Sequence, residues 1–587
     1  MTYLAKVATA LTAKRLLEHV TVTLPHPPPV AEQLTTILLG AHCCPRCVLR
    51  FLGVRDRNVH ANLLSLTKEW SGLPLGGQHV NGEALAEEVE VETESEDGVE
   101  AKRAKLEKED GNVVGVPNPA SRPNPVSETA LPPPANDSTP QRTCSACLGL
   151  LQCDHRDVAG KAFKLFQSEG YSLGSNNKTF LLSMRLPPQL AIRQRSFVML
   201  MEKEMGADKV DGSVSVEVKE ILKYLISDAF AETSSIAYDP ESPFSLTVHY
   251  DHPQTKKEYE FMTKIPDADF KIKTSRQKGQ ILVHGASFEK IAKSVDKLSY
   301  VHFADAAMCP PPVVTKPPRL VELGLQHAPI YVAGRYLKLQ RHISNSPWEI
   351  GGKRMTEHSV EELIANKVDA FFRNDGHKFY SSGREDADVL MLGRGRPYYL
   401  ELVNPRRVEA SETELQALQD TINKEANGMV QSRDMQIVPR EETKILKDAA
   451  NTKSKSYSTL VKLASPVTIE ALDEVSKIKD LAIKQQNPTR VPRRADLMRD
   501  KVIESLRVYP AAPAQDAAVS PTDEVRVDLR TSAGTYVKEF VHGDNGRTNP
   551  NLASLLGVEW AKVLELDVLE VHLDWPKQTA SEVAQLI

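Results

Sequence analysis

The stretch Gly383-Arg384-Glu385-Asp386-Ala387-Asp388-Val389 decides how this chain is interpreted. Ahead of it, residues Ser359 to Arg373 carry apolar side chains at helical spacing and begin with a Ser-x-x-Glu capping pair, which predicts an amphipathic helix. After it, Pro397 to Val403 is apolar and aromatic and ends at an Asn-Pro pair, which predicts a strand. A second capping pair, Ser411 with Glu414, predicts a further helix from Ser411 to Ala426. We therefore expect Asp386 to lie on a loop between rigid elements, a common position for catalytic groups.

Alone, an aspartate beside an arginine in a glycine-bounded loop is typical of a turn or a surface ion pair. Two later segments change this interpretation. Lys455 to Val461 has the sequence K-S-Y-S-T-L-V, and Ser532 to Phe540 has the sequence S-A-G-T-Y-V-K-E-F. In this order the three segments resemble the active-site motifs of pseudouridine synthases. G-R-x-D is similar to the aspartate motif of the TruA type, and G-T-Y-V-K is similar to the basic motif of the TruB type.

Further motifs narrow the resemblance to the archaeal and eukaryotic T-arm enzymes of the Pus-ten type. The resemblance is good from about residue 331 to about residue 575 and looser before that. It implies an isomerase, a tRNA pseudouridine synthase that converts uridine to pseudouridine in the T-arm of tRNA and needs no organic cofactor. The motifs that carry it are Gly334-Arg335-Tyr336, Gly383 to Val389, Gly395-Arg396-Pro397, Glu401 to Arg406 and His542-Gly543-Asp544.

The resemblance implies three catalytic residues. Asp386 is the catalytic carboxylate, Lys538 is the cation that keeps it ionised, and Tyr457 is the aromatic platform for the uracil. In the family the aspartate acts either as a nucleophile or as a base that generates a glycal, and the sequence does not choose between them. Taken singly, the ordinary interpretations are a loop aspartate, a surface lysine and a buried tyrosine. We expect the three side chains to converge in one cleft, with the acid about 3 Å from the ammonium.

Two residues are candidates for the pocket of the target base. Arg384 would help to extrude or replace the flipped base; the alternative is a structural ion pair with Asp388 or Glu401. Leu556, or its neighbour Leu555, would line the uracil pocket; the alternative is an ordinary buried leucine.

A basic segment later in the chain is a candidate for binding the tRNA backbone. Arg490, Arg493 and Arg494 would contact phosphates, which adds affinity and salt sensitivity but no sequence readout. The family pattern has a histidine before the paired arginines, whereas this chain has Pro492 and is one residue shorter. The alternative interpretation is the solvated start of a helix.

Two Cys-x-x-Cys pairs indicate a metal site. Cys44 with Cys47, and Cys144 with Cys147, can each offer two thiolates and together complete a tetrahedral, structural zinc site. The long intervening stretch is no objection if it is a disordered insertion, because the cost of loop closure rises only logarithmically with length. The alternative is two unrelated pairs of buried thiols, and Cys43 or Cys153 would be the nearest competing ligands.

Composition indicates a multidomain protein without a membrane span. At 587 residues we expect two or three domains, and there is no run of about 18 apolar residues. The formal net charge is -5, but residues 83–110 hold 12 acidic and 4 basic residues, a balance of -8. The remainder is therefore -5 + 8 = +3, which is compatible with clustered phosphate contacts.

The predicted fold class is α+β, with a pseudouridine-synthase catalytic domain around a central, mainly antiparallel sheet. The resemblance adds an N-terminal zinc-bearing, THUMP-containing α/β accessory domain that binds RNA. The predicted parts are an N-terminal zinc-knuckle part (1–78), a disordered acidic and proline-rich insertion (79–140), the second knuckle with the THUMP-containing domain (141–318) and the catalytic domain (319–587).

The expected partner is tRNA, the expected state is a monomer without membrane association, and the expected location is the nucleus and the cytoplasm. The alternative function is a non-catalytic RNA-binding or RNA-chaperone protein that retains the synthase fold. The presence of all three catalytic motifs favours the enzyme.

Overall fold

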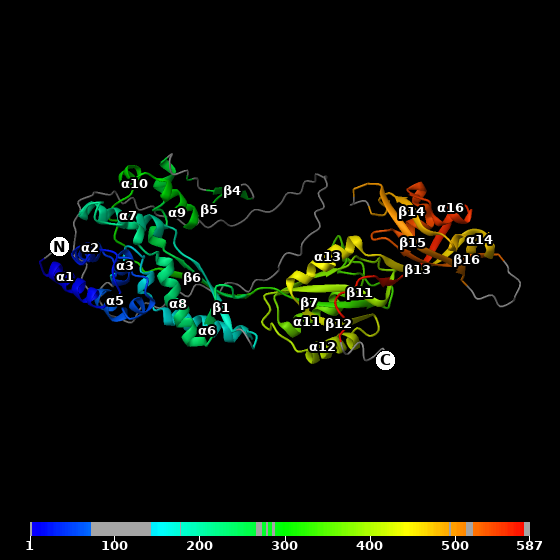
Figure 1. Cartoon of the computed structure of the whole chain (residues 1–587), viewed down its shortest axis with the longest axis horizontal. Helices are drawn as coiled ribbons and strands as arrows, with labels where there is room; N and C mark the ends of the chain where they lie inside the picture. Colours follow the sequence, from blue (N-terminus) through cyan, green and yellow to red (C-terminus); the bar gives the residue numbers. More distant parts are fainter. Residues whose placement is uncertain are drawn as a thin grey trace, which may run out of the picture. The chain divides into compact units, whose positions relative to one another are not determined.

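The structure is a computed structural model in which the chain forms two compact units (Figure 1). The predicted insertion at 79–140 lies outside the residues that the structure describes. The described residues are 3–20, 22–71, 142–175, 178–265, 270, 273–277, 280–284, 288–491, 495–511 and 521–579. The first unit comprises Met1–Ala159, Ser183–Ala229 and Thr247–Leu323, and the second comprises Gly160–Leu182, Phe230–Leu246 and Gly324–Ile587.

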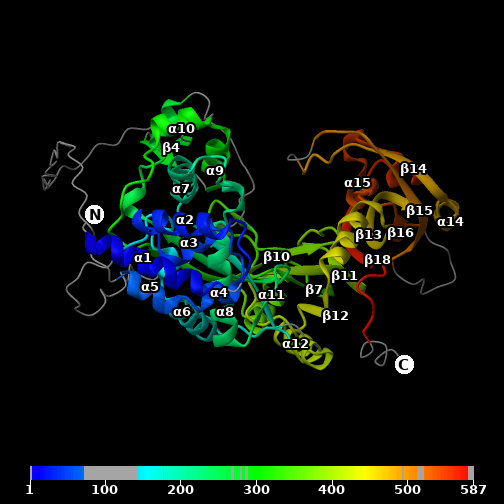
Figure 2. The same cartoon turned by 60° about the vertical axis from the view of Figure 1, so that its left-hand side comes forward.

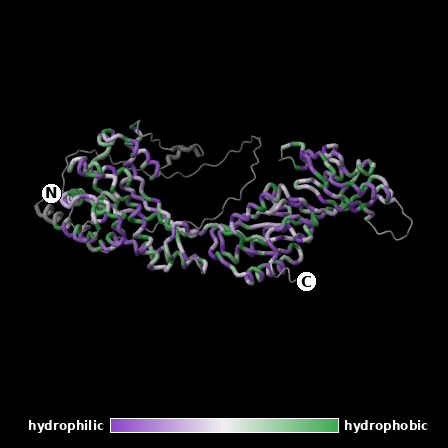
Figure 3. The backbone as a smooth tube through the Cα atoms, viewed as in Figure 1, coloured by the Kyte–Doolittle hydropathy of each residue, from purple (hydrophilic) through white to green (hydrophobic). Residues whose placement is uncertain are grey.

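The first unit is built mainly from helices. Its helices are α1 (Tyr3–Glu18), α2 (Pro28–Gly40), α3 (Pro45–Phe51), α4 (Arg57–Ala61), α5 (Leu64–Ser71), α7 (Gln189–Met205), α8 (Val218–Ser234), α9 (Phe288–Lys297) and α10 (Tyr300–Ala306), with α8 ending beyond the unit boundary. A hairpin of β4 (Lys273–Gln277) and β5 (Gln280–His284) completes it. Within the described ranges, none of the helices has the length and apolar character needed to cross a bilayer, and hydrophilic residues interrupt the hydrophobic ones throughout (Figure 3).

The segments at the unit boundaries form α6 (His155–Glu169) and a four-stranded sheet. The strand order of this sheet is β2-β1-β3-β6, and β1 and β2 pair in parallel. Its strands are β1 (Thr179–Arg185), β2 (Ala237–Tyr238), β3 (Phe244–Asp251) and β6 (Arg319–His327).

The second unit is organised by a ten-stranded sheet, as predicted for the C-terminal region. Its order is β12-β7-β11-β18-β13-β16-β15-β14-β17, and β10 pairs with β11 (Figures 1 and 2). Among the described residues, every strand pairing in this sheet is antiparallel except the short parallel pair between β11 and β18. The strands are β7 (Ile330–Lys338), β10 (Gly376–Ser381), β11 (Leu390–Val403), β12 (Val430–Val438), β13 (Lys455–Val467), β14 (Lys479–Gln485), β15 (Arg499–Pro510), β16 (Thr522–Thr531), β17 (Thr548–Asn549) and β18 (Ala561–Val571).

Helices complete this unit, and one hydrophobic core runs through it from Val332 on β7 to Val571 on β18. The remaining elements are α11 (Val360–Phe372), α12 (Glu412–Glu425), α13 (Thr443–Thr452), α14 (Ile469–Ser476), α15 (Val537–His542), α16 (Leu552–Leu556) and a hairpin of β8 (Glu349–Ile350) and β9 (Lys353–Arg354).

Local sequence explains where α11 and α12, the helices before and after the aspartate loop in the sequence, begin. The Ser359 side chain accepts a hydrogen bond from the backbone N–H of Glu362 and caps α11, and Ser411 with Glu414 forms a full capping box on α12. Both helices are therefore confirmed. The predicted strand at 397–403 is also confirmed, but β11 is longer than predicted, and β10 was not predicted at all.

A bulge in β11 requires two glycines. The pairing with β7 shifts register between Met391 and Arg396, where Gly393 (φ +61°) and Gly395 (φ +82°) adopt left-handed conformations. A Cβ on Gly393 would lie 2.0 Å from the carbonyl oxygen of Leu569, and one on Gly395 would lie 2.7 Å from that of Tyr336. The Gly-Arg-Gly-Arg stretch is therefore a strand bulge that allows close backbone approach.

A charged histidine ties α11 to β10. Nδ1 of His377 lies 2.7 Å from Asp369 and Nε2 lies 3.3 Å from Glu361. Burial by itself lowers the pKa of His377, but the hydrogen bonds to the two carboxylates outweigh it and raise the pKa from 6.5 to about 9.

We predict that this histidine makes the second unit less stable at alkaline pH. Because the pKa is higher in the folded state than in the unfolded state, the stabilisation is fully present below pH 6.5 and is lost as pH rises through 9. His377→Gln should therefore cost about 2 kcal/mol of unfolding free energy at pH 6 and much less at pH 10. Denaturant unfolding of both proteins across this range measures the difference; a difference that does not change with pH would contradict the prediction.

Candidate active site

The loop from Ser382 to Val389 joins β10 to β11 and carries the predicted catalytic aspartate. Lys338, a buried lysine at the end of β7, holds its backbone. The ammonium of Lys338 donates to the carbonyl oxygens of Asp386 (2.9 Å), Ala387 (3.2 Å) and Ile343 (2.9 Å). Burial lowers the pKa of Lys338, while the carboxylates of Glu385 and Asp388 oppose that shift. The ammonium of Lys338 thus holds the backbone of the loop at two consecutive carbonyl groups.

Glu385 turns inward and anchors the loop. Its carboxylate accepts a hydrogen bond of 2.8 Å from Arg396, and both side chains are at most 3% exposed. The hydroxyl of Tyr336 donates to the same carboxylate at 2.9 Å, and Arg396 also donates to the carbonyl oxygen of Ser382 at 3.0 Å. A buried charge is tolerated when it is paired and hydrogen-bonded. This network therefore specifies one conformation for the loop.

Asp386, the next residue, faces outward into a cluster of cations. Its Oδ2 lies 3.1 Å from Nζ of Lys538 and 3.1 Å from Nη1 of Arg490. Its Oδ1 has only a longer bond, of 3.4 Å, to the same Nη1. The carboxylate is 43% exposed and so remains accessible. Two cations thus engage mainly one oxygen and leave the other for a reacting atom.

Helix α15 supplies Lys538 and also fixes Arg490. Nζ of Lys538 lies 2.9 Å from Asp388, whose pKa falls below its ordinary value because the hydrogen bond and the charge of Lys538 outweigh the opposing effect of burial. Glu539, which is 2% exposed, lies 2.6 Å from Nε of Arg490. Arg490 therefore bridges a buried glutamate and the exposed aspartate.

Tyr457 lies beside the anchor of the loop. On β13 it is opposite Leu529 of β16 and Val568 of β18, and it is partly buried against the core. Burial raises its pKa, and the charges of Arg396 and Glu385 act on it in opposite directions, so the ring lies close to this ion pair. Among the described residues, no hydrogen bond joins its hydroxyl to Asp386. The structure therefore brings Asp386 and Lys538 into contact and places Tyr457 near the Glu385–Arg396 pair that anchors the loop.

The remaining predicted residues have mixed outcomes. Arg384 is exposed, and neither alternative ion pair is formed, because Asp388 binds Lys538 and Glu401 binds Lys378. Leu556 is 9% exposed and belongs to the hydrophobic core, which is the ordinary interpretation of a buried leucine.

The structure describes one of the three arginines of the predicted basic segment. The guanidinium of Arg490 lies against Asp386 and Glu539 and is 42% exposed, and its contact with the tRNA backbone stays a prediction. Arg493 and Arg494 lie outside the described residues, so their assignment to the tRNA backbone stays a prediction.

The four predicted cysteine ligands meet in the first unit. The sulfur atoms of Cys44, Cys47, Cys144 and Cys147 are buried and all lie within 4.8 Å of one another, so the cluster could hold a metal ion. Tetrahedral zinc with bonds of about 2.3 Å would hold its sulfurs about 3.8 Å apart. The sulfurs of Cys44 and Cys147 are 3.9 Å apart. The donor set and spacing therefore fit such an ion, and Cys43 and Cys153 are not part of the cluster.

Comparison with known proteins identifies the family. A family described as "Pus10, C-terminal" matches residues 331–572, and one described as "Eukaryotic Pus10, N-terminal" matches residues 144–322. The mouse protein "tRNA pseudouridine synthase Pus10" is 33% identical over 555 residues, which cover 93% of this chain and 98% of that protein. The chain belongs to the Pus10 family.

Other relatives of this Pus10 chain agree. The human protein of the same name is 32% identical, and the match covers 93% of this chain and 98% of the human protein. The protein of that name from Thermofilum pendens is 39% identical over 42% of this chain and 54% of its own length. A solved Cbf5-Nop10-Gar1 complex matches 40% of this chain and 48% of its own with a TM-score of 0.23 and 16% identity, values too low to support an argument.

The structure also gives the Pus10 motifs physical roles that the sequence did not reveal. Arg335, which is fully buried, donates to the carbonyl oxygens of Gly395 (2.8 Å), Leu573 and Trp575 (both 2.9 Å), so it ties the β11 bulge to the chain beyond β18. Charged residues that alternate with tyrosine and glycine inside an apolar strand were the available indication. Lys338 and Glu539 had no such indication, because their partners are distant in the sequence.

We predict that Lys338→Met destabilises the second unit by about 2 to 4 kcal/mol, because three buried carbonyl oxygens lose their donor. Denaturant unfolding measures this loss. The matched control is Lys378→Met, which removes an exposed lysine paired with Glu401 at 2.8 Å and should cost less than about 1 kcal/mol. Equal losses for the two variants would contradict the proposed support of the loop.

Proposed function

We propose that this chain is a tRNA pseudouridine synthase that isomerises uridine in the T-arm of tRNA, with Asp386 as the catalytic carboxylate. The observation that carries the proposal is the 3.1 Å contact between Asp386 and Lys538, which come from motifs far apart in the sequence. The relatives named tRNA pseudouridine synthase support the choice of reaction. We also propose that the N-terminal half, including a THUMP-containing part, binds the tRNA.

The reaction breaks the bond between C1′ of the ribose and N1 of the uracil and forms a bond from C1′ to C5. The proton on C5 is lost and N1 gains one, so the change is an isomerisation without redox chemistry. A uridine in folded RNA must first be flipped out of its stack, at a cost of a few kcal/mol. The active site must then hold an ionised carboxylate beside the sugar and support the detached base.

Asp386 meets the first requirement. Lys538 and Arg490 both contact Oδ2, so Oδ1 is the oxygen that faces the ribose. This oxygen either attacks the sugar or removes a proton from it, and both routes use the negative charge of the carboxylate. Preorganised cations of this kind need no rearrangement when the reaction begins.

Tyr457 and Arg384 are proposed to handle the base. The hydroxyl of Tyr457 is neutral near pH 7, and burial raises its pKa further, so the ring offers an uncharged face to the uracil. Arg384 is exposed and directly precedes the anchored Glu385, where it can occupy the space of the flipped base. Leu556 is retained only as a core residue that supports this region.

We predict that Asp386→Asn abolishes pseudouridine formation while tRNA affinity stays within about threefold of wild type, because the substitution removes charge but little volume. Carbodiimide primer extension on unmodified tRNA measures turnover, and filter binding measures affinity. Asp388→Asn removes the neighbouring charge on the same loop and should reduce turnover without abolishing it.

The same experiment decides between the enzyme and the non-catalytic RNA-binding or RNA-chaperone protein. Equal activity of wild type and Asp386→Asn would exclude this site, whereas tRNA binding without any product from wild type would favour the RNA chaperone. The monomeric state and the nuclear and cytoplasmic location stay predictions.

We further propose that the four-cysteine cluster holds one structural zinc ion. Thiolate ligands in a closed, buried tetrahedral set are typical of structural zinc, which lowers the free energy of the folded state when bound. The cysteines would join segments separated by the insertion, and Arg193 on α7 adds a further link by donating to the carbonyl oxygen of Ser145 at 2.6 Å.

We predict about one zinc ion per chain in freshly purified protein, the number that two thiolate pairs can fill. Cys44→Ser or Cys147→Ser should release the metal and lower the thermal stability of the first unit. Cys309→Ser, which alters a cysteine outside the cluster, should retain the full metal content. Elemental analysis by mass spectrometry measures the metal, and its absence from wild type would refute the zinc assignment.

A further inference from the structure

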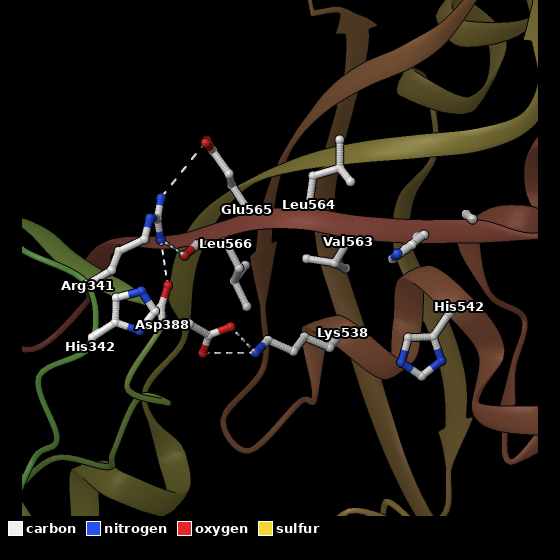
Figure 4. A pocket seen from close by; sticks show the side chains of 11 residues that line it. Arg341, His342, Asp388, Lys538, His542, Val563, Leu564, Glu565 and Leu566 are labelled. Carbon is white, nitrogen blue, oxygen red and sulfur yellow. Dashed lines mark hydrogen bonds and ion pairs between the residues drawn. The ribbon is translucent and has the colours of Figure 1, made fainter. Parts of the chain in front are cut away.

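A cavity of about 540 Å³ lies beside the catalytic carboxylate and has no part in the reaction described above (Figure 4). Lys538 and Asp388 line it, whereas Asp386 does not. The cavity therefore adjoins the reaction site without covering its carboxylate. Its volume falls in the range of about 300 to 1,000 Å³ that is usual for sites of small organic groups.

One wall of the cavity is apolar. It is formed by β18 and includes the side chains of Val563 and Leu566, which lie on the side of the strand that Lys538 and His542 occupy, whereas Leu564 and Glu565 project from the other side (Figure 4). Val563 is partly exposed although it is an aliphatic residue. An apolar surface that stays open to solvent is suited to contact with the flat face of a nucleobase.

His542 offers a hydrogen-bond donor to this space. It lies four residues after Lys538 on α15, so the two side chains project from the same face of the helix. Nδ1 of His542 accepts a hydrogen bond of 3.0 Å from the backbone N–H of Asp544. In the neutral ring the proton therefore sits on Nε2, the nitrogen that is free to donate to a ligand.

The opposite side of the cavity is held rigid by Arg341. Its guanidinium lies 2.9 Å from Asp567 and donates to the carbonyl oxygens of Asp388 (2.6 Å) and Leu566 (3.3 Å). Arg341 is thus part of the wall. Lys562, an exposed cation in the lining, is placed to contact a phosphate of an RNA chain.

We propose that this cavity is a subsite for a second, unpaired nucleotide next to the target uridine in the RNA. Its base would lie on the apolar wall of β18 and accept a hydrogen bond from His542. Unpaired bases are held in this manner, by stacking together with hydrogen bonds to their edges. The subsite rests on the proposed function, because only an RNA whose uridine reaches Asp386 places the neighbouring nucleotide here.

A series of stem-loop RNAs tests the proposal. Each RNA carries the target uridine and a single abasic site, which is placed at a different unpaired position in each member of the series. With wild type, an abasic site at one position should lower kcat/KM about tenfold, because one base loses its contacts. In His542→Ala the intact RNA should react about fivefold more slowly at low concentration, and the abasic site at that position should cost no more than about twofold. Val563→Ala, which shortens a side chain of the apolar wall, should give the same coupling.

The control is His358→Ala, an exposed histidine outside the cavity, which should respond to every RNA as wild type does. The subsite is refuted if His542→Ala and Val563→Ala respond to all abasic RNAs in the same proportion as wild type, or if no abasic position affects wild type. A wild-type protein that forms no pseudouridine on intact RNA refutes the proposed function instead, so the two failures are distinguishable.

Discussion

The buried ion pair between Glu385 and Arg396 is the constraint on which the site depends. Both side chains are almost fully excluded from solvent and meet at 2.8 Å. Such a pair adds little net stability, because the cost of removing two charges from water offsets their attraction, but loss of one partner costs about 3 to 5 kcal/mol. The pair instead specifies one conformation of the loop. With Glu385 turned inward, the next residue, Asp386, is directed outward.

The position of this loop at a seam in the sheet completes the site. In the described part of the ten-stranded sheet, β11 and β18 form the one parallel pair, through Leu390 and Met391. Asp386 precedes this pair on one side, and α15, which carries Lys538, contacts β18 on the other. Because one hydrophobic core continues across the seam, the carboxylate and the ammonium keep a fixed separation. The same continuity places the apolar wall of β18 beside Lys538.

Local features of the fold could be predicted from the sequence, whereas partners that are distant along the chain could not. The caps at Ser359 and Ser411 are encoded within four residues, and both helices were predicted correctly. The cysteine cluster was also predictable, because thiol pairs at this spacing have few alternative uses. The pairing of Arg490 with Asp386, 104 residues away, was not predicted, because a free arginine and a paired one look identical in a sequence. For the same reason β10 and the support by Lys338 were missed.

The pairing of Arg490 explains how an anionic site can accept an anionic substrate. A phosphate about 7 Å from Asp386 would repel it by about 2 kcal/mol at an effective dielectric constant near 20. Lys538 and Arg490 oppose that repulsion at 3.1 Å each, and the buried Glu539 keeps Arg490 in place. Under the proposed function, Arg490 therefore offsets the charge of the RNA at the carboxylate.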